Sequence, residues 1–210
     1  MRSGIEKVME EISKSLPNIP VFMSTQEKEI SYVNSDTAVI ISTSGMEPTS
    51  PKGFAAAVLL DGEELSSRPF IRAEEDLLQR WMKTLQRLAR GGEIYLSLPS
   101  THKISQAIIS NNPTRYLADE LSDRRKIGLP PTRIVIRIES KEENLSALRS
   151  RLSQQFPNSS IHLSGDSRTV TILQPSNENV ECLASLRALQ KVRSVQSKEI
   201  FRISINPYHF

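Results

Sequence analysis

Arg133-Ile-Val-Ile-Arg-Ile-Glu139 alternates polar and apolar side chains, which is the pattern of a β-strand with one buried face. Two further apolar runs, at 160–163 and 169–173, lie on either side of Gly165-Asp166, a pair typical of a tight turn. The three runs therefore predict one strand followed by a β-hairpin.

Helical patterns separate these strands. Apolar residues recur at helical spacing over 142–156 and again over 180–192, and residues 199–205 have the composition of a last strand. The predicted order is therefore β-α-β-β-α-β, which is the ferredoxin-like plan of an α+β domain.

The first half of the chain has the character of an α/β domain. Short apolar runs occur at 21–23, 38–41 and 55–60, and turns rich in Ser, Thr, Gly and Pro bound the last two, as is usual for buried parallel strands. The predicted helices cover residues 5–16, 72–90, 104–109 and 113–125, and a further strand over 93–98 follows Gly91-Gly92.

Length and composition limit the class of protein. With 210 residues, 38% of them hydrophobic and 24% charged, the chain has the composition of a folded protein with two small domains. No apolar run approaches the roughly 20 residues of a membrane span, and no secretory signal pattern opens the chain. We therefore expect a cytoplasmic protein without membrane contact. The net charge of +3 permits nucleic-acid binding without requiring it.

The sequence lacks the usual signatures of enzymes. The phosphate-binding pattern Gly-x-x-x-x-Gly-Lys-Ser/Thr occurs nowhere, so an NTPase would have no site for its phosphates. The single cysteine, Cys182, excludes an internal disulfide and a multi-cysteine zinc site, and the three histidines are too scattered to replace thiolates. We expect no enzymatic activity, no catalytic residue, no metal and no cofactor.

Four features have a functional and a structural interpretation, and the structural one is favoured for each. Ser42-Thr43-Ser44-Gly45 and Asp61-Gly62 follow predicted strands and are interpreted as turns rather than as phosphate or metal sites. Cys182 lies in an apolar helical stretch and is interpreted as an inert, buried thiol. Trp81 belongs to the apolar stripe of its helix and is interpreted as a core residue.

Two basic clusters are candidates for phosphate contacts. In the first, basic residues recur every three or four positions and share the helix face opposite the apolar stripe: Arg80, Lys83, Arg87 and Arg90. The second cluster surrounds Gly128-Leu129-Pro130-Pro131 and comprises Arg124, Arg125, Lys126, Arg133 and Arg137. Acidic residues are interleaved with the second cluster, so phosphate binding and a solvated surface remain alternatives for both clusters.

The proline pair Pro130-Pro131 favours a domain boundary, because neither proline continues a helix.

Particular motifs resemble a known family. Glu120-Leu-Ser-Asp-Arg-Arg-Lys-Ile-Gly-Leu-Pro-Pro131 resembles the segment that opens the C-terminal domain of the PriA (primosomal protein N′) family of replication-restart helicases. Upstream, Gly53-Phe-Ala-Ala-Ala-Val-Leu-Leu-Asp-Gly62 and Arg68-Pro-Phe-Ile-Arg-Ala-Glu-Glu75 resemble part of that family's second helicase lobe. Ala38-Val-Ile-Ile-Ser-Thr-Ser-Gly-Met-Glu-Pro48 and Arg80-Trp-Met82 are most similar to the divergent actinobacterial branch, which lacks the helicase motifs.

The resemblance implies an architecture. Residues 1–112 would be a remnant of a RecA-like second helicase lobe, and residues 113–210 would be the PriA-type C-terminal domain. The family is one of ATP-dependent 3′–5′ DNA helicases that use ATP and zinc and act in DNA replication, repair and recombination. This sequence differs from the family in one helicase motif: the family's Gly-Arg-Ala-Gly-Arg is replaced by Gln86-Arg-Leu-Ala-Arg90. The family's N-terminal DNA-binding domain, first lobe and cysteine-rich zinc module have no counterpart in the 210 residues.

The resemblance also implies a function. We expect a replication-restart protein that assembles primosomes without helicase activity of its own. It would bind branched DNA, such as forks and D-loops, or primosome and single-strand-binding proteins. The alternative is a protein-interaction subunit or a non-functional remnant that docks on a separate chain and binds no DNA. A helicase or hydrolase would instead turn over ATP.

Overall fold

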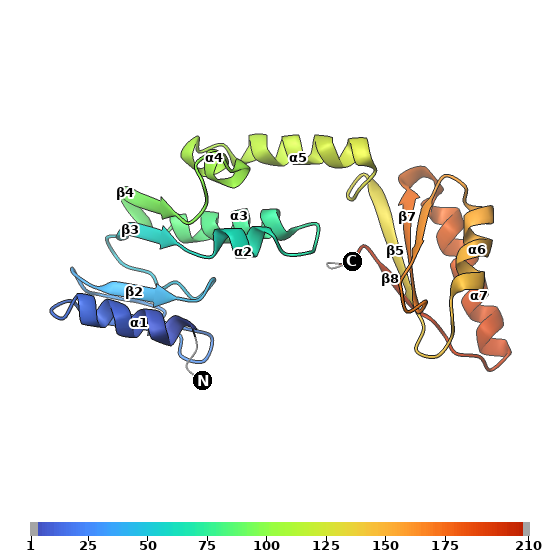
Figure 1. Cartoon of the computed structure of the whole chain (residues 1–210), viewed down its shortest axis with the longest axis horizontal. Coiled ribbons are helices and arrows are strands. Elements are labelled where there is room, and N and C mark those ends of the chain that lie inside the picture. Colours follow the sequence, from blue (N-terminus) through green and yellow to red (C-terminus); the bar gives the residue numbers. More distant parts are fainter. Residues whose placement is uncertain (1–3, 208–210) are drawn as a thin grey trace. The chain divides into compact units, whose positions relative to one another are not determined.

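The chain forms two compact units in a computed structural model that describes residues 4–207 (Figure 1). The first unit extends to Pro113 and the second begins at Thr114. The helix that carries the Glu120–Pro131 motif therefore groups with the second unit. The proline pair at 130 and 131 consequently lies inside that unit rather than between the two, contrary to the boundary that it favours in the sequence. No helix of the described residues has the length and apolar character needed to cross a bilayer.

The first unit contains two separate pairs of parallel strands. β1 (Val21–Ser24) pairs with β2 (Val39–Ser42), and β3 (Phe54–Leu59) pairs with β4 (Leu88–Leu96). The helices of this unit are α1 (Gly4–Ser15), α2 (Gly62–Ser66), α3 (Ala73–Leu85) and α4 (Lys103–Ile109). The predicted parallel pairing is confirmed. The predicted burial of these strands is wrong, because β2 has no fully buried residue and β3 buries only Leu59.

α3 is shorter than the sequence pattern predicts. It ends at Leu85, and residues 88–96 form β4 instead of the end of a long helix. The reason is a close approach of two backbones. Cβ atoms added at Gly53 and Gly92 would lie 2.6 Å from the Ala89 nitrogen and 3.0 Å from the Phe54 carbonyl oxygen. Long-range strand pairing thus overrides the helical periodicity of residues 86–90.

Gly62 packs the start of α2 against the core of the first unit. Asp61 adopts a left-handed conformation with φ of 60°, and Gly62 begins α2 fully buried, with its N–H donating to the Ser97 hydroxyl at 2.9 Å. A Cβ at Gly62 would lie 2.5 Å from Leu98 Cγ and 2.8 Å from Trp81 Cη2. Trp81 is 5% exposed, which confirms its interpretation as a core residue.

The second unit is an antiparallel sheet covered on one face by two helices. Its strands are β5 (Arg133–Glu139), β6 (Ser160–Leu163), β7 (Thr169–Pro175) and β8 (Arg202–Ile205), hydrogen-bonded in the order β6-β7-β5-β8. α5 (Pro113–Ile127) precedes the sheet, α6 (Ser146–Gln155) joins β5 to β6, and η1 (Ser176–Glu178) with α7 (Asn179–Val195) joins β7 to β8. α6 and α7 lie on the same side of the sheet (Figure 1).

The core of this unit follows from strand alternation. Ile136 and Ile138 of β5 pair with Ile172 and Val170 of β7, and all four side chains are fully buried. They belong to one cluster with residues from α6, α7 and β6. Cys182 of α7 lies in that cluster, and burial is the main reason that its pKa rises to about 11. The predicted burial of Cys182 is confirmed, and a raised pKa is typical of an unreactive thiol.

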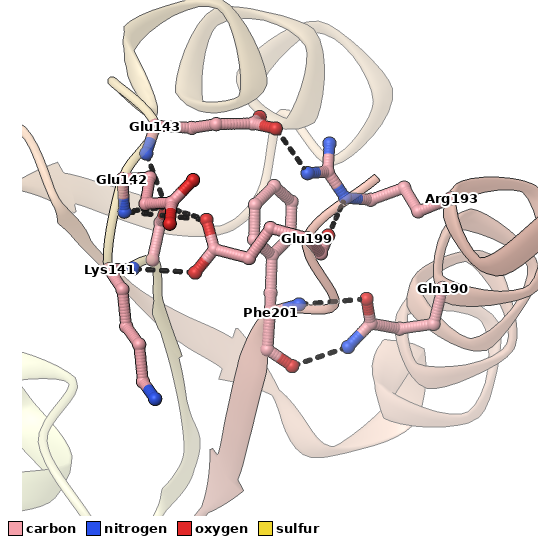
Figure 2. A network of polar contacts seen from close by, with 8 residues as sticks. Lys141, Glu142, Glu143, Gln190, Arg193, Glu199 and Phe201 are labelled. Carbon is pink, nitrogen blue, oxygen red and sulfur yellow. Dashed lines mark hydrogen bonds and ion pairs between the residues drawn. The ribbon is translucent and has the colours of Figure 1, made fainter. Parts of the chain in front are cut away.

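A network of polar contacts fixes the entry to β8 (Figure 2). The Glu199 carboxylate accepts hydrogen bonds from the Ser140 hydroxyl and the Lys141 N–H, both at 2.6 Å. Arg193 donates to the Glu199 carbonyl oxygen at 2.6 Å and to Glu143 at 2.5 Å, with its guanidinium 3.8 Å above the Phe201 ring. One carboxylate thus ties the loop after β5 to the strand that closes the sheet.

We predict that Glu199→Gln makes thermal stability less dependent on pH. The Ser140 hydroxyl first, and then the Lys141 N–H, lower the pKa of Glu199 below its ordinary value. This carboxylate therefore stabilises the fold above its unfolded pKa, and the contribution disappears as the pH falls through the folded pKa. Melting curves from pH 7 to pH 3 should show wild type more stable at pH 7 and the two proteins converging in acid. A constant difference would contradict the role of the ionised carboxylate.

We also predict that Gly62→Ala lowers the free energy of unfolding by about 1–3 kcal/mol, because the added methyl group overlaps Leu98 and Trp81. Gly165→Ala is the matched control, since a Cβ at Gly165 has nothing within 4 Å. Its effect should stay within about 0.5 kcal/mol in urea titrations. Equal effects of the two substitutions would rule out the overlap.

Candidate nucleic-acid interface

The last turn of α5 and the first residue of β5 bring together most of the second basic cluster. Arg125, Lys126 and Arg133 line an open hollow of about 570 Å³, with Thr132 and Asn177 among its other polar residues. The chain turns between α5 and β5 at Gly128, whose φ is +70°. This left-handed turn is what allows cations from a helix and from a strand to face one space.

Arg133 is held in place by backbone oxygen atoms. Its Nη1 donates to the carbonyl groups of Asn158 at 3.0 Å and of Leu173 at 3.3 Å. A Cβ at Gly128 would lie 3.0 Å from Arg133 Nε, so the turn and the guanidinium are in close contact. Neutral partners leave the positive charge of Arg133 uncompensated on this side of the hollow.

Lys126 has an acidic partner. Its ammonium lies 2.9 Å from the Asp123 carboxylate, and both side chains are largely exposed. The hydrogen bond to Asp123 raises the pKa of Lys126 above its ordinary value. An exposed pair of this kind is weak and exchanges readily for other partners. Arg125 is also exposed.

Arg124 has a structural role, which corrects its prediction as a phosphate contact. Its side chain is only 6% exposed, Nε lies 2.8 Å from Glu120 Oε1, and Nη1 makes a long contact of 3.5 Å to the Pro130 carbonyl oxygen. The side chain thus connects α5 to the turn that follows it. A buried guanidinium paired in this way supports the hollow and does not face it.

Arg137 lies apart from the hollow. It points to the same side of β5 as Arg133, because Ile136 and Ile138 face the core. Its Nη2 lies 2.9 Å from Glu139, which also attracts Arg202 at 3.7 Å. Its Nε is buried and makes no hydrogen bond within the described chain. The neighbouring acid reduces the local positive charge.

The first basic cluster does not form the single helix face that the sequence predicts. Arg80 and Lys83 are exposed on α3, whereas Arg87 lies in the turn after it and Arg90 lies on β4. The Arg87 carbonyl oxygen accepts a hydrogen bond from the Phe54 N–H, so this segment is committed to strand pairing. Only two of the four cations share a helix.

Sequence reasoning missed the far wall of the hollow. Pro175 and Asn177 reach it because Arg133 pairs with Pro175 in the β5–β7 register. No local motif marks these residues, and only the strand register could have indicated them. Within residues 4–207 no three His, Cys, Asp or Glu side chains are arranged to hold a metal ion.

Comparison with known proteins places the chain near one family, although no family model matches it. It is 31% identical over 149 residues to the probable replication restart protein PriA of Mycobacterium tuberculosis, covering 69% of the chain and 23% of the relative. The protein of the same name from Mycobacterium leprae is 26% identical over 229 residues, covering 98% of the chain and 35% of the relative. The chain thus spans about a quarter to a third of the length of these relatives. The chain is therefore similar to a part of proteins that carry the name probable replication restart protein PriA.

Proposed function

We propose that the chain is a replication-restart factor without helicase activity, whose second unit binds branched DNA such as forks and D-loops. The observation that carries this proposal is the hollow lined by Arg125, Lys126 and Arg133. Cations that converge on an open, hydrated space suit contacts with backbone phosphates, which favour Lys and Arg and need no enclosed pocket.

The fold supports a more specific assignment within this proposal. The strand order β6-β7-β5-β8 and the helices on one face of the sheet are consistent with the ferredoxin-like plan. In the first unit, the two pairs of parallel strands, one of them with α2 and α3 between its strands, are consistent with a remnant of a RecA-like lobe. We infer that the chain corresponds to the end of the second helicase lobe and the C-terminal domain of its PriA relatives.

The absence of a P-loop pattern from the sequence supports the non-catalytic part of the proposal. Arg87 and Arg90, which resemble arginines of a helicase motif, lie in a turn and on a strand. The 210 residues contain no phosphate-binding loop that would hold a nucleotide against them. ATP turnover by the purified chain would contradict this part.

A second candidate function is an interaction subunit that docks on another polypeptide and touches no DNA. The observation in its favour is the first unit, where α1 has no buried residue and β3 is largely exposed. Primosome and single-strand-binding proteins are partners to consider under either proposal. The two functions differ in one property, since only the first requires salt-sensitive binding of DNA.

We predict that Arg125→Ala with Lys126→Ala weakens fork binding and flattens its salt dependence. Loss of two phosphate contacts should reduce the slope of log affinity against log salt by about 1.8. Fluorescence anisotropy with labelled forked, duplex and single-stranded DNA measures this slope. Arg80→Ala with Lys83→Ala is the matched control, since it removes the same charge from exposed positions on α3. Unchanged fork binding by the first variant would refute the assignment of the hollow.

Arg124→Ala should act on stability. Removing the guanidinium leaves Glu120 without its partner and should cost about 1–3 kcal/mol of unfolding free energy. Arg125→Ala, one residue away and exposed, should change it by less than about 0.5 kcal/mol. Urea titrations compare the two variants, and an equal loss in both would contradict the buried, structural role of Arg124.

A further inference from the structure

The helices that cover the sheet of the second unit hold the excess positive charge of the chain. α6 and α7 together contain one acidic residue and five basic residues, which are Arg149, Arg151, Arg187, Lys191 and Arg193. The net charge of these helices is +4, whereas that of the whole chain is +3, so all the remaining residues together carry −1. A polyanion is therefore attracted to these two helices rather than to the chain in general.

Four of the five cations are exposed and have no acidic partner. Arg193 is buried and paired with Glu143, whereas the other four side chains face solvent. None of these four forms an ion pair with any residue in the range 4–207. The cations of α5 differ in this respect, since Arg115, Arg124 and Lys126 each lie beside an acid of the same helix. The four cations thus retain their full charge for an external partner.

α6 and α7 present one continuous surface. They lie on the same side of the sheet (Figure 1), and the Gln155 amide of α6 donates a hydrogen bond to Ser185 Oγ of α7 at 2.9 Å. Leu152, Cys182 and Leu186 point to the core, so the opposite sides of both helices face solvent. We call this surface the helix layer, and its exposed basic residues are Arg149, Arg151, Arg187 and Lys191.

One edge of the helix layer has further groups that suit a phosphate. Arg149 lines a second hollow, of about 340 Å³, together with the hydroxyl-bearing Ser146 and Ser150 and with His162. Arginine and serine side chains are among the usual contacts of the DNA backbone. The residues of α6 and β6 that line this second hollow include no carboxylate.

The spacing of the cations suits a long polyanion rather than a small one. They are distributed over two helices, and the 17 residues of α7 extend over about 25 Å. This length is roughly three-quarters of the ~34 Å in one turn of duplex DNA. Because duplex DNA carries one phosphate charge for about every 1.7 Å of its axis, separated cations can each contact a phosphate of the same duplex.

The helix layer faces in a different direction from the basic hollow of Arg125, Lys126 and Arg133. That hollow opens where β5 begins and β7 ends, whereas the helix layer faces away from the surface of the sheet (Figure 1). Duplex DNA is stiff over tens of base pairs. One straight arm of a branched molecule therefore contacts one of these surfaces and not both.

We propose that the helix layer is a second DNA-contact surface, which binds the backbone phosphates of one duplex arm of a fork while the basic hollow binds another arm. This inference rests on the proposed function and gives a reason for a preference for branched DNA. A fork engages both surfaces at once, and the second contact is strengthened because the first one tethers it. A linear duplex engages one surface at a time.

The test compares a fork with two duplex arms and a linear duplex of the same total length in fluorescence anisotropy over a salt series. Arg151→Gln with Arg187→Gln and Lys191→Gln removes three charges of the helix layer, and glutamine keeps the helix propensity of these exposed positions. Fork binding at low salt should weaken at least about tenfold, and the slope of log affinity against log salt should fall by up to about 2.7. Binding of the linear duplex should weaken only about twofold, because the basic hollow remains available.

The matched control is Arg80→Gln with Lys83→Gln and Lys103→Gln, which removes the same charge from exposed positions of the first unit. This control should bind the fork like wild type. Equal fork affinity of the helix-layer variant and the control would overturn the inference, also if the helix-layer variant alone lost binding to phosphatidylglycerol vesicles, since the surface would then serve a membrane. An equal loss for fork and linear duplex would overturn it as well, because the helix layer would not be taking a second arm.

The proposed function fails or stands separately from this inference. If Arg125→Ala with Lys126→Ala weakens fork binding and the helix-layer variant does not, the basic hollow keeps its role and only the second surface is removed. If wild type binds no fork at low salt, both the proposed function and the second surface are wrong.

Discussion

The antiparallel pairing of β5 with β7 is the constraint on which the second unit depends. It places Ile136 opposite Ile172 and Ile138 opposite Val170, which creates the centre of the core beneath α6 and α7. The same register sets Arg133 opposite Pro175 at the other end of the pair. One set of backbone hydrogen bonds therefore builds both the apolar core and the wall of the basic hollow. Rigid strands, rather than flexible loops, hold the cation that faces it.

The second unit was predictable because its signals are local. The alternation of residues 133–139 and the turn at Gly165-Asp166 each specify their own segment, and the order of the elements follows from them. The conformation of residues 86–90 was not predictable in this way. Their spacing continues a helix, but a contact with a strand more than 30 positions earlier, through Gly53 and Gly92, determines their conformation. Such a contact leaves no periodic trace in the sequence.

The candidate site was predictable in its residue types but not in its geometry. A run of three basic residues indicates a cluster, yet helical geometry turns Arg124 inward to Glu120 and leaves Arg125 and Lys126 at the surface. Asn177 joins them only through strand register. A difference of one position along a helix thus separates a structural arginine from a candidate phosphate contact.

The two units carry the observations behind two different candidate functions. The second has a continuous core and a basic hollow, and it is the unit that we propose to bind DNA. The first has parallel strand pairs with exposed apolar surface, which is the observation behind the second candidate function. The most direct measurement for the central claim is hydrogen exchange of the chain with and without forked DNA at low salt. We expect slower exchange at residues 125–133 and 175–177. Protection confined to α3, or none at all, would contradict the assignment of the hollow to DNA.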